Sequence, residues 1–318
     1  MPRLFSFRIL FLLSTLTVIL IFAFMFYNIK GSWEFILPFR SGKLLALVTV
    51  AYSVAVSTVL FQTVTHNRIL TPSIMGFDQL YLLIQTVIVF TAGSLHLGWF
   101  NQTNGFFISS FLLILFAGTL FGWLFTGHGK SLHLVLLVGI VFGVFFRSIT
   151  NLLNRMLDPN EFAVLQDRFF ANFNTYNSNI LTAAIIIVCL VSFIGWKMRH
   201  SFDVLALGQE TAINLGIDYR RTVTTILFLV TVLVSVSTAL VGPVTFFGLL
   251  VASLAYQLSG TARHSIILSV AILIAVISLV GGQFVLERIF QFNTTLSIII
   301  EFIGGIVFIL LLLKGKIR

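Results

Sequence analysis

Ten long apolar stretches run through this chain of 318 residues and constrain its fold more than any other feature. A helix that crosses a bilayer needs about 20 mostly apolar residues, and short polar segments separate the stretches. The eighth stretch is short and follows Gly242-Pro243, so we expect a broken or tilted helix there. The expected spans are residues 9–27, 43–65, 74–94, 106–126, 132–152, 179–197, 222–241, 244–259, 265–285 and 295–313.

The composition supports an apolar environment. Hydrophobic residues make up 58% of the chain and charged residues only 9%, whereas soluble proteins carry about 25% charged residues. The net charge of +9 does not indicate nucleic-acid binding, because the 19 Lys and Arg are scattered singly between apolar runs. We therefore predict an all-α polytopic membrane protein with about ten transmembrane helices.

The basic residues also predict the orientation. With both termini in the cytoplasm, twelve of the 19 Lys and Arg lie in inner segments and seven in outer segments, as the positive-inside rule favours. We expect residues 153–178 outside, with a short amphipathic helix, and residues 198–221 inside. The chain is expected to form a single transmembrane domain of two five-span halves, about residues 1–175 and 176–318.

The inner segment 198–221 has the pattern of a short amphipathic helix. Gly208 interrupts this helix and Gly216 closes it, as glycine often does at a helix C-terminus. Such a helix can dock into a groove on a soluble partner, or it can rest on the membrane surface, and spacing alone leaves both open. Its apolar side chains are Leu205, Leu207, Ala212, Leu215 and Ile217.

Four segments follow one another in a recognisable order. They are Gln62 with Asn-Arg-Ile-Leu-Thr-Pro at 67–72 and Gly76, Leu207-Gly208-x3-Ala212-x2-Leu215-Gly216, Gly242-Pro243-x2-Phe246-x-Gly248-Leu249, and Glu301-Phe302-x-Gly304-Gly305-x2-Phe308. The set resembles the FecCD-type permeases, which import iron–siderophores, haem and vitamin B12. This resemblance runs the length of the chain and implies the BtuC-like (type II ABC importer) permease fold.

The resemblance implies partners on both sides of the membrane. A cytoplasmic ATP-binding subunit would couple through the inner segment, at Leu207, Gly208, Glu210, Ala212, Leu215 and Gly216. A second permease chain, related but different, would complete the translocation pathway. Candidates for lining that pathway are Gln62, Asn67 and Thr71.

Three outer basic residues match positions at which the family binds its substrate-binding protein, a lipoprotein or a periplasmic protein. Arg40-Ser41-Gly42-Lys43 stands where the family has Arg-x-Pro-Arg, and Arg288 precedes the tenth span. Residues 40 and 43 are three apart, so in a helix they would face the same way. Outward charges of one sign steer an acidic partner. The alternative is that these side chains reach lipid headgroups.

The implied function is ATP-driven import of a ferric siderophore across the bacterial cytoplasmic (inner) membrane by alternating access. The segment NRILTPSIMGFDQLY resembles a branch whose cargo is often a catecholate siderophore. No cofactor or resident metal is expected, because the iron stays wrapped in its chelator. No ATPase activity is expected in this chain, because Gly127-His128-Gly129-Lys130-Ser131 lacks the first glycine of a phosphate-binding loop.

The alternative is an ion-coupled secondary transporter, which would need ionisable groups at mid-membrane. Two acids lie near or within the spans. Asp78 is expected near the inner mouth, in a capping or gating role, and Glu301 is expected to be neutral and hydrogen-bonded between helices.

Overall fold

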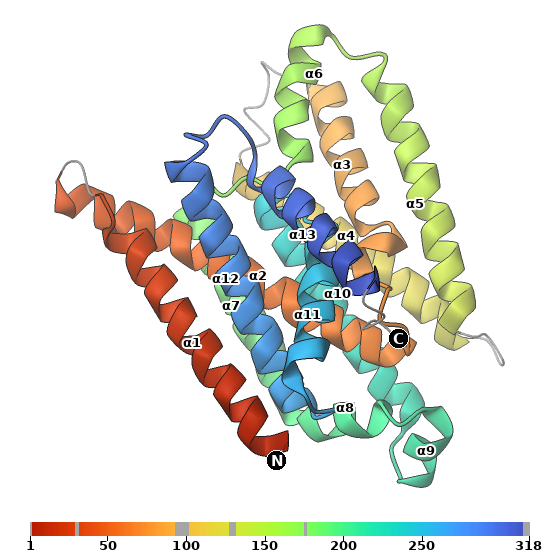
Figure 1. The fold of residues 1–318 in the computed structure, drawn as a ribbon. Coiled ribbons are helices and arrows are strands. Elements are labelled where there is room, and N and C mark those ends of the chain that lie inside the picture. The colour runs from red at the N-terminus through yellow and green to blue at the C-terminus, as the bar shows by residue number, and fades with distance from the viewer. Residues whose placement is uncertain (1, 29–31, 93–101, 127–131, 175–176, 314–318) are drawn as a thin grey trace.

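A computed structural model of the protein describes residues 2–28, 32–92, 102–126, 132–174 and 177–313. All regular structure in these ranges is helical (Figure 1). The boundary expected between the two halves and the segment Gly127–Ser131 lie outside them. The elements are α1 (Pro2–Phe26), α2 (Trp33–Thr65), the 3-10 helix η1 (Pro72–Met75), α3 (Phe77–Ala92), α4 (Gln102–Thr126), α5 (Leu132–Asn154), α6 (Pro159–Gln166), the 3-10 helix η2 (Asp167–Phe169), α7 (Ser178–Lys197), α8 (Arg199–Leu205), α9 (Gln209–Asn214), α10 (Tyr219–Val241), α11 (Phe247–Ser259), α12 (His264–Arg288) and α13 (Leu296–Leu313).

Each of the ten expected spans coincides with one helix, so the predicted fold class is confirmed. Within the described ranges, seven helices are long and apolar enough to cross a membrane, and the other three expected spans fall on the shorter apolar helices α3, α11 and α13. Helix α2 begins at Trp33, earlier than the expected residue 43. Its 33 residues reach about 50 Å, well beyond the hydrocarbon core of about 30 Å.

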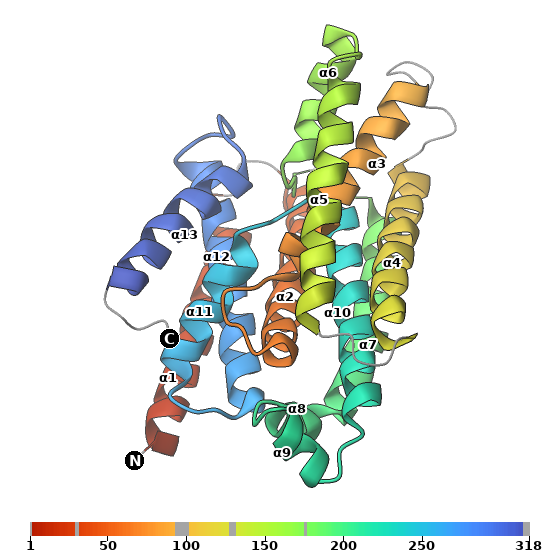
Figure 2. The same cartoon turned by 90° about the vertical axis from the view of Figure 1, so that its right-hand side faces the viewer.

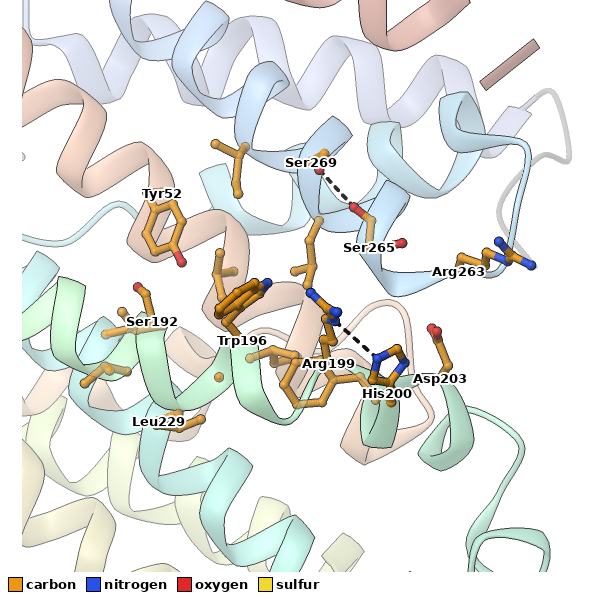
Figure 3. Close-up of a pocket in the computed structure, with 18 residues that line it drawn as sticks. Tyr52, Ser192, Trp196, Arg199, His200, Asp203, Leu229, Arg263, Ser265 and Ser269 are labelled. Carbon is orange, nitrogen blue, oxygen red and sulfur yellow. Dashed lines mark hydrogen bonds between the residues drawn. The ribbon is translucent and has the colours of Figure 1, made fainter. Parts of the chain in front are cut away.

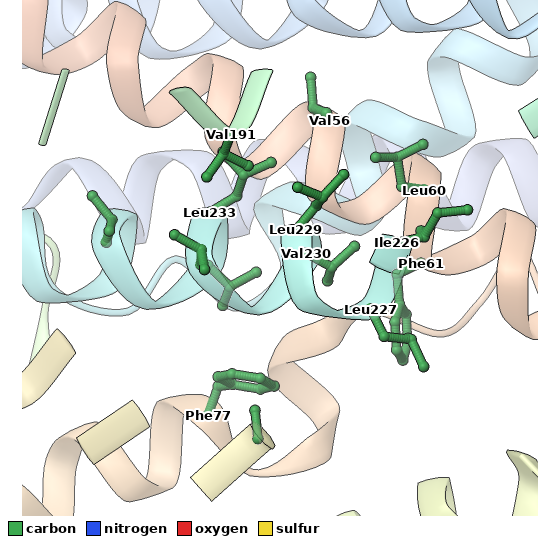
Figure 4. Packing of buried hydrophobic residues seen from close by; sticks show 14 of the residues in the cluster. Val56, Leu60, Phe61, Phe77, Val191, Ile226, Leu227, Leu229, Val230 and Leu233 are labelled. Carbon is green, nitrogen blue, oxygen red and sulfur yellow. The ribbon is translucent and has the colours of Figure 1, made fainter. Parts of the chain in front are cut away.

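Helix α2 lies at the centre of the bundle and packs against α10 and α12 (Figures 1 and 2). One buried cluster joins the second half of α2 to α3, α4, α7 and α10, and a second joins α2 to α1, α11, α12 and α13. In Figure 4, Leu60 and Phe61 of α2 lie beside Ile226 of α10. Because α2 packs against helices from the second half of the chain, the two expected halves interleave.

Glycines allow three close helix contacts, as small residues do in membrane proteins. A Cβ at Gly76 would lie 3.0 Å from Gly143, where η1 approaches α5. A Cβ at Gly248 would meet the hydroxyl of Thr58, where α11 crosses α2, and one at Gly304 would lie 3.0 Å from Leu250, where α13 crosses α11. These glycines belong to the motifs that the sequence singled out.

The predicted break before the eighth span is confirmed. Helix α10 ends at Val241, and Gly242 follows with φ of +101°, a conformation that L residues other than glycine rarely adopt. Pro243 and a short turn then lead to α11, which has 13 residues. The backbone therefore changes direction inside the bundle, between α2, α3 and α13.

Two polar segments lie at opposite ends of the bundle. Helix α6 is at one end, and α8, α9 and the N-terminus are at the other (Figure 1). Following the predicted orientation, we name the end with α6 the outer end and the end with α8 and α9 the inner end.

Candidate functional site

Arg40 caps the preceding helix at the outer end. Its Nη1 donates hydrogen bonds to the carbonyl oxygens of Phe24 at 3.1 Å, Met25 at 2.8 Å and Tyr27 at 3.2 Å. The last carbonyls of an α-helix have no partner within the helix, and a cation there also complements the helix dipole. The Arg40 side chain is half-buried, so much of its hydrogen-bonding capacity is directed inward.

Arg288, at the end of α12, meets the same helix terminus. Its Nη2 donates to the carbonyl oxygen of Tyr27 at 2.9 Å, and its guanidinium lies 5.7 Å from the Tyr27 ring centroid. Arg40 and Arg288 therefore converge on one carbonyl, although 248 residues separate them in the sequence. The structure thus brings two of the three predicted docking residues together at the outer end.

Lys43 differs from the two arginines because it is buried, with only 3% of its surface exposed. Its ammonium donates to Glu287 Oε1 at 2.7 Å and to Asn174 Oδ1 at 3.0 Å. Gln283 Nε2 donates to the same two oxygens, at 2.9 Å to Glu287 and 3.0 Å to Asn174. These four side chains, which we call the outer polar cluster, join α2, α12 and the segment before α7.

The geometry changes the interpretation of Lys43. Residues 40 and 43 do lie in one helix, yet their side chains do not share an outward face: Arg40 turns toward α1 and Lys43 toward α12. A buried cation needs a partner, and Glu287 supplies it. Sequence reasoning missed Glu287 and Gln283, although their spacing of four residues puts them on one face of a helix.

At the inner end, α8 and α9 form a projecting helical hairpin (Figure 2). Gly208, with φ of +100°, separates the two helices, and Gly216, with φ of +84°, follows α9, as predicted. Ala212 is fully buried and fixes α9 to the bundle, whereas Leu207 and Leu215 are about 60% exposed. Glu210 is exposed in the first turn of α9. The hairpin therefore presents apolar side chains at an end that lies outside the expected membrane core.

A partly buried hydrogen-bonded pair, Asp203 and His264, attaches this hairpin to the bundle. Asp203 of α8 accepts hydrogen bonds from the backbone nitrogen of His264 at 2.7 Å and from its ring Nδ1 at 2.9 Å. The other ring nitrogen lies 2.8 Å from the hydroxyl of Thr63 in α2. Asp203 thus caps the N-terminus of α12 and links it to α8, a role that sequence reasoning did not identify.

The three candidates for the translocation pathway lie at the end of α2 and in the turn that follows it: Gln62 is in the last turn of the helix, and Asn67 and Thr71 come after it. Gln62 is buried and its Nε2 donates to the carbonyl oxygen of Arg68 at 2.7 Å, while Asn67 Oδ1 accepts from the backbone nitrogen of Ile69 at 3.0 Å. Thr71 is buried beside a cavity of about 20 Å³, room for about one water molecule. In this conformation Gln62 and Asn67 shape the turn.

The two intramembrane acids lie in different environments. Asp78 is buried in the first turn of α3, where a carboxylate complements the helix dipole, and its Oδ2 accepts from the Thr245 hydroxyl at 2.7 Å. Glu301 is exposed on α13 and has no hydrogen-bond partner in the described part of the chain, contrary to expectation. A carboxyl group that faces acyl chains is costly, so this position needs a polar neighbour or water.

Comparisons with known proteins agree with the motifs. Residues 4–314 match the model of the FecCD transport family. The chain is 49% identical to the petrobactin import system permease protein YclO of Bacillus subtilis (strain 168), over 95% of this chain and 96% of that protein. It is 35% identical to the petrobactin import system permease protein FatC of Bacillus anthracis, over 87% of this chain and 78% of that protein.

The fold also matches a solved structure of an ABC transporter assigned to the metal-chelate type, in an inward-facing conformation. The TM-score is 0.80 at 22% identity, and the match covers 97% of this chain and 99% of that chain. The family model and the Bacillus subtilis relative both match along nearly the whole chain, and the chain therefore belongs to the FecCD transport family.

Proposed function

We propose that this chain is the membrane-spanning permease subunit of an ABC importer for ferric siderophores. The observation that carries the proposal is 49% identity to a petrobactin permease along 95% of the chain. Petrobactin is a catecholate-like siderophore, so the cargo we propose is a ferric catecholate of this kind. Transport proceeds by alternating access in the bacterial cytoplasmic membrane, with both termini inside.

The inner hairpin is the proposed docking site for a separate ATP-hydrolysing subunit. Leu207 and Leu215 are exposed apolar side chains on a projecting element, and Glu210 lies between them in sequence. Apolar anchors of this kind fit into a groove of a soluble partner. Because Asp203 connects α8 to the N-terminus of α12, a movement of the hairpin would act on that helix directly.

The outer end is the proposed docking site for a substrate-binding protein. Arg40 and Arg288 are half-buried and lie together at the end of α1, where they can still offer guanidinium groups to acidic side chains. Lys43 lies beneath them, held by Glu287. We assign Lys43 a positioning role, because its ammonium holds the part of α12 that carries Arg288.

A second, related permease chain is the proposed neighbour of α13. Glu301 is exposed on α13, and the other exposed side chains described for this helix are apolar. An unpaired carboxyl group is better accommodated by a water-filled pathway between two permease chains than by lipid. The pathway itself is proposed to lie at that interface.

Uptake of ⁵⁵Fe–petrobactin in cells lacking their own petrobactin importer tests the proposal. Cells that express this chain with its neighbouring transport genes should accumulate iron, and deletion of the ATPase gene should abolish uptake. Uptake that persists without the ATPase would support the ion-coupled alternative. Uptake of other chelates but not of petrobactin would contradict the proposed cargo.

A further inference from the structure

A large cavity opens at the inner end, beside α8 of the inner hairpin but apart from Leu207 and Leu215, the exposed side chains assigned to docking. Its volume is about 770 Å³, within the range of small-molecule sites. Helices α2 and α10 form its floor, α7 and α12 form its sides, and α8 lies across its inner end (Figure 3). Helix α7 carries exposed apolar side chains along its span, among them Ile186, Leu190 and Phe193, so this side of the cavity lies beside a face that suits lipid.

The cavity is divided into a basic part and an apolar part. At its inner end it is lined by Arg199, His200 and Arg263, all exposed. Deeper in the span it is lined by apolar side chains: Val56, Leu60, Leu229, Leu233, Leu268 and Ile272. This order follows the order of chemical groups in a phospholipid, from an anionic headgroup at the interface to acyl chains in the core.

The side chains between the two parts suit the level of the lipid glycerol and esters. Trp196 lies at the boundary, where tryptophan is enriched in membrane proteins, and its ring stacks against Arg199 at 5.1 Å. Figure 3 shows the Tyr52 hydroxyl directed into the cavity. Ser265 and Ser269 add hydroxyl groups on the α12 side.

One acid also lines the cavity, but its charge is directed elsewhere. Asp203 Oδ1 accepts both hydrogen bonds from His264, so it faces the N-terminus of α12. Arg199 Nε donates to His200 Nε2 at 3.3 Å, which leaves the terminal nitrogens of the guanidinium for an anion. The formal charge of the two arginines and Asp203 is +1 with both histidines neutral.

We propose that this cavity binds one anionic phospholipid of the inner leaflet. Its phosphate accepts hydrogen bonds from Arg199 and Arg263, and its acyl chains fill the apolar groove between α7 and α12. Basic pockets between transmembrane helices on the cytoplasmic side are typical sites for acidic lipid headgroups. The lipid would bridge α8, part of the inner hairpin, to the first turn of α12.

Quenching of Trp196 by brominated lipid tests this directly, because Trp196 lines the cavity. The protein would carry W33F, W99F and W123F, leaving Trp196 as its only tryptophan. It is reconstituted in phosphatidylcholine vesicles that contain either dibromo-phosphatidylglycerol or dibromo-phosphatidylcholine. We expect phosphatidylglycerol to associate several-fold more strongly, since each basic residue near the surface contributes about fivefold.

The variant R199Q/R263Q should bring the ratio of the two association constants close to one. K197Q is the matched control, because Lys197 is exposed, neighbours Trp196 in sequence and does not line the cavity. It should keep the preference for phosphatidylglycerol. Equal quenching by both lipids in the parent protein, or an equal loss in K197Q, would overturn the proposal.

A second measurement does not depend on the tryptophan substitutions. Native mass spectrometry of the wild-type chain should retain one phosphatidylglycerol and no phosphatidylcholine after delipidation in mild detergent, and R199Q/R263Q should lose it. Competition with inorganic phosphate distinguishes a lipid site from a site for small anions. If phosphate at millimolar concentration displaces the lipid or binds in its place, the site is one for small anions and the lipid proposal fails.

Discussion

The two ends of the bundle use their basic residues in opposite ways. At the outer end, Arg40, Lys43 and Arg288 all form hydrogen bonds inside the protein, to helix carbonyls or to Glu287. At the inner end, Arg199 and Arg263 remain exposed beside a cavity. Basic residues therefore hold helices together at the outer end, whereas at the inner end they are available to bind other molecules.

A basic residue at the end of a span therefore has two possible roles. It can satisfy the unpaired carbonyls of a helix, as Arg40 does for α1, or it can remain available for a partner. Helix α12 is held by polar contacts at both ends, since Asp203 bonds its first residue and the outer polar cluster includes its last two turns. One helix thus connects the two ends.

Substitutions in the outer polar cluster should change the stability of the protein most. Replacing Lys43 by Met, or Glu287 by Met, leaves one buried partner without its counter-charge, and each single change should destabilise the protein by about 3–5 kcal/mol. The double variant K43M/E287M removes both charges and should be more stable than either single variant. Unfolding of the detergent-purified chain measures all three.

Together the three variants form a double-mutant cycle, which separates the interaction energy of Lys43 and Glu287 from the packing of each side chain by itself. If the effects of the two single substitutions add in the double variant, Lys43 and Glu287 do not form an energetic pair, and the contrast between the ends is weaker than the geometry implies. S41A serves as the control, because Ser41 is two residues from Lys43 and bonds only within its own helix. It should change stability by less than about 0.5 kcal/mol.

Substitutions in the inner hairpin should weaken association with the ATPase subunit. L207A and L215A remove exposed apolar anchors from the proposed ATPase surface, and each should weaken association about tenfold or more. Pull-down of the ATPase subunit by the membrane-inserted permease measures it. L190A is the matched control, since Leu190 is 62% exposed but lies within the span of α7. Equal losses in all three variants would place the docking surface elsewhere.

The sequence predicted the helices well because their signal is local. Apolar runs of sufficient length mark each span, and Gly242-Pro243 marks the break before α11. Gly208 and Gly216 likewise mark the ends of α9 through their backbone conformation. These features depend on residues that are close in sequence, so they can be identified without the fold.

The partners of the polar side chains could not be predicted in this way. Lys43 lies 244 residues from Glu287, and Asp203 lies 61 residues from His264. Burial of Lys43 depends on how α2 and α12 cross, which apolar helices do not encode in their periodicity. Gln62 is similar: its residue type suited a pathway, but its amide is occupied by the turn that it stabilises.

Breaking the link between the hairpin and α12 should destabilise the protein less than breaking the outer polar cluster. D203A removes the acceptor for the backbone nitrogen and the ring of His264, and should destabilise the protein by about 1–2 kcal/mol, as loss of a helix cap does. D203N keeps an acceptor for the backbone nitrogen and should recover about half of this loss. Thermal unfolding of the two variants measures the difference. If D203N is no more stable than D203A, the carboxylate charge on the imidazole matters more than the cap.

Substitution of Arg288 should have the smallest effect, on docking of the binding protein, and it tests whether an outer basic residue is structural or available to a partner. Because its guanidinium is half-buried and shared with the carbonyl of Tyr27, R288Q should weaken docking of the binding protein only a few-fold. The loss should shrink at high salt, as screening predicts for an exposed charge. R155Q, an exposed outer charge in the turn after α5, is the control and should leave affinity unchanged. A loss in R288Q that is independent of salt would mean that Arg288 acts by holding α1 and α12 together, so that it is structural in the same sense as Lys43, which holds α2 to α12.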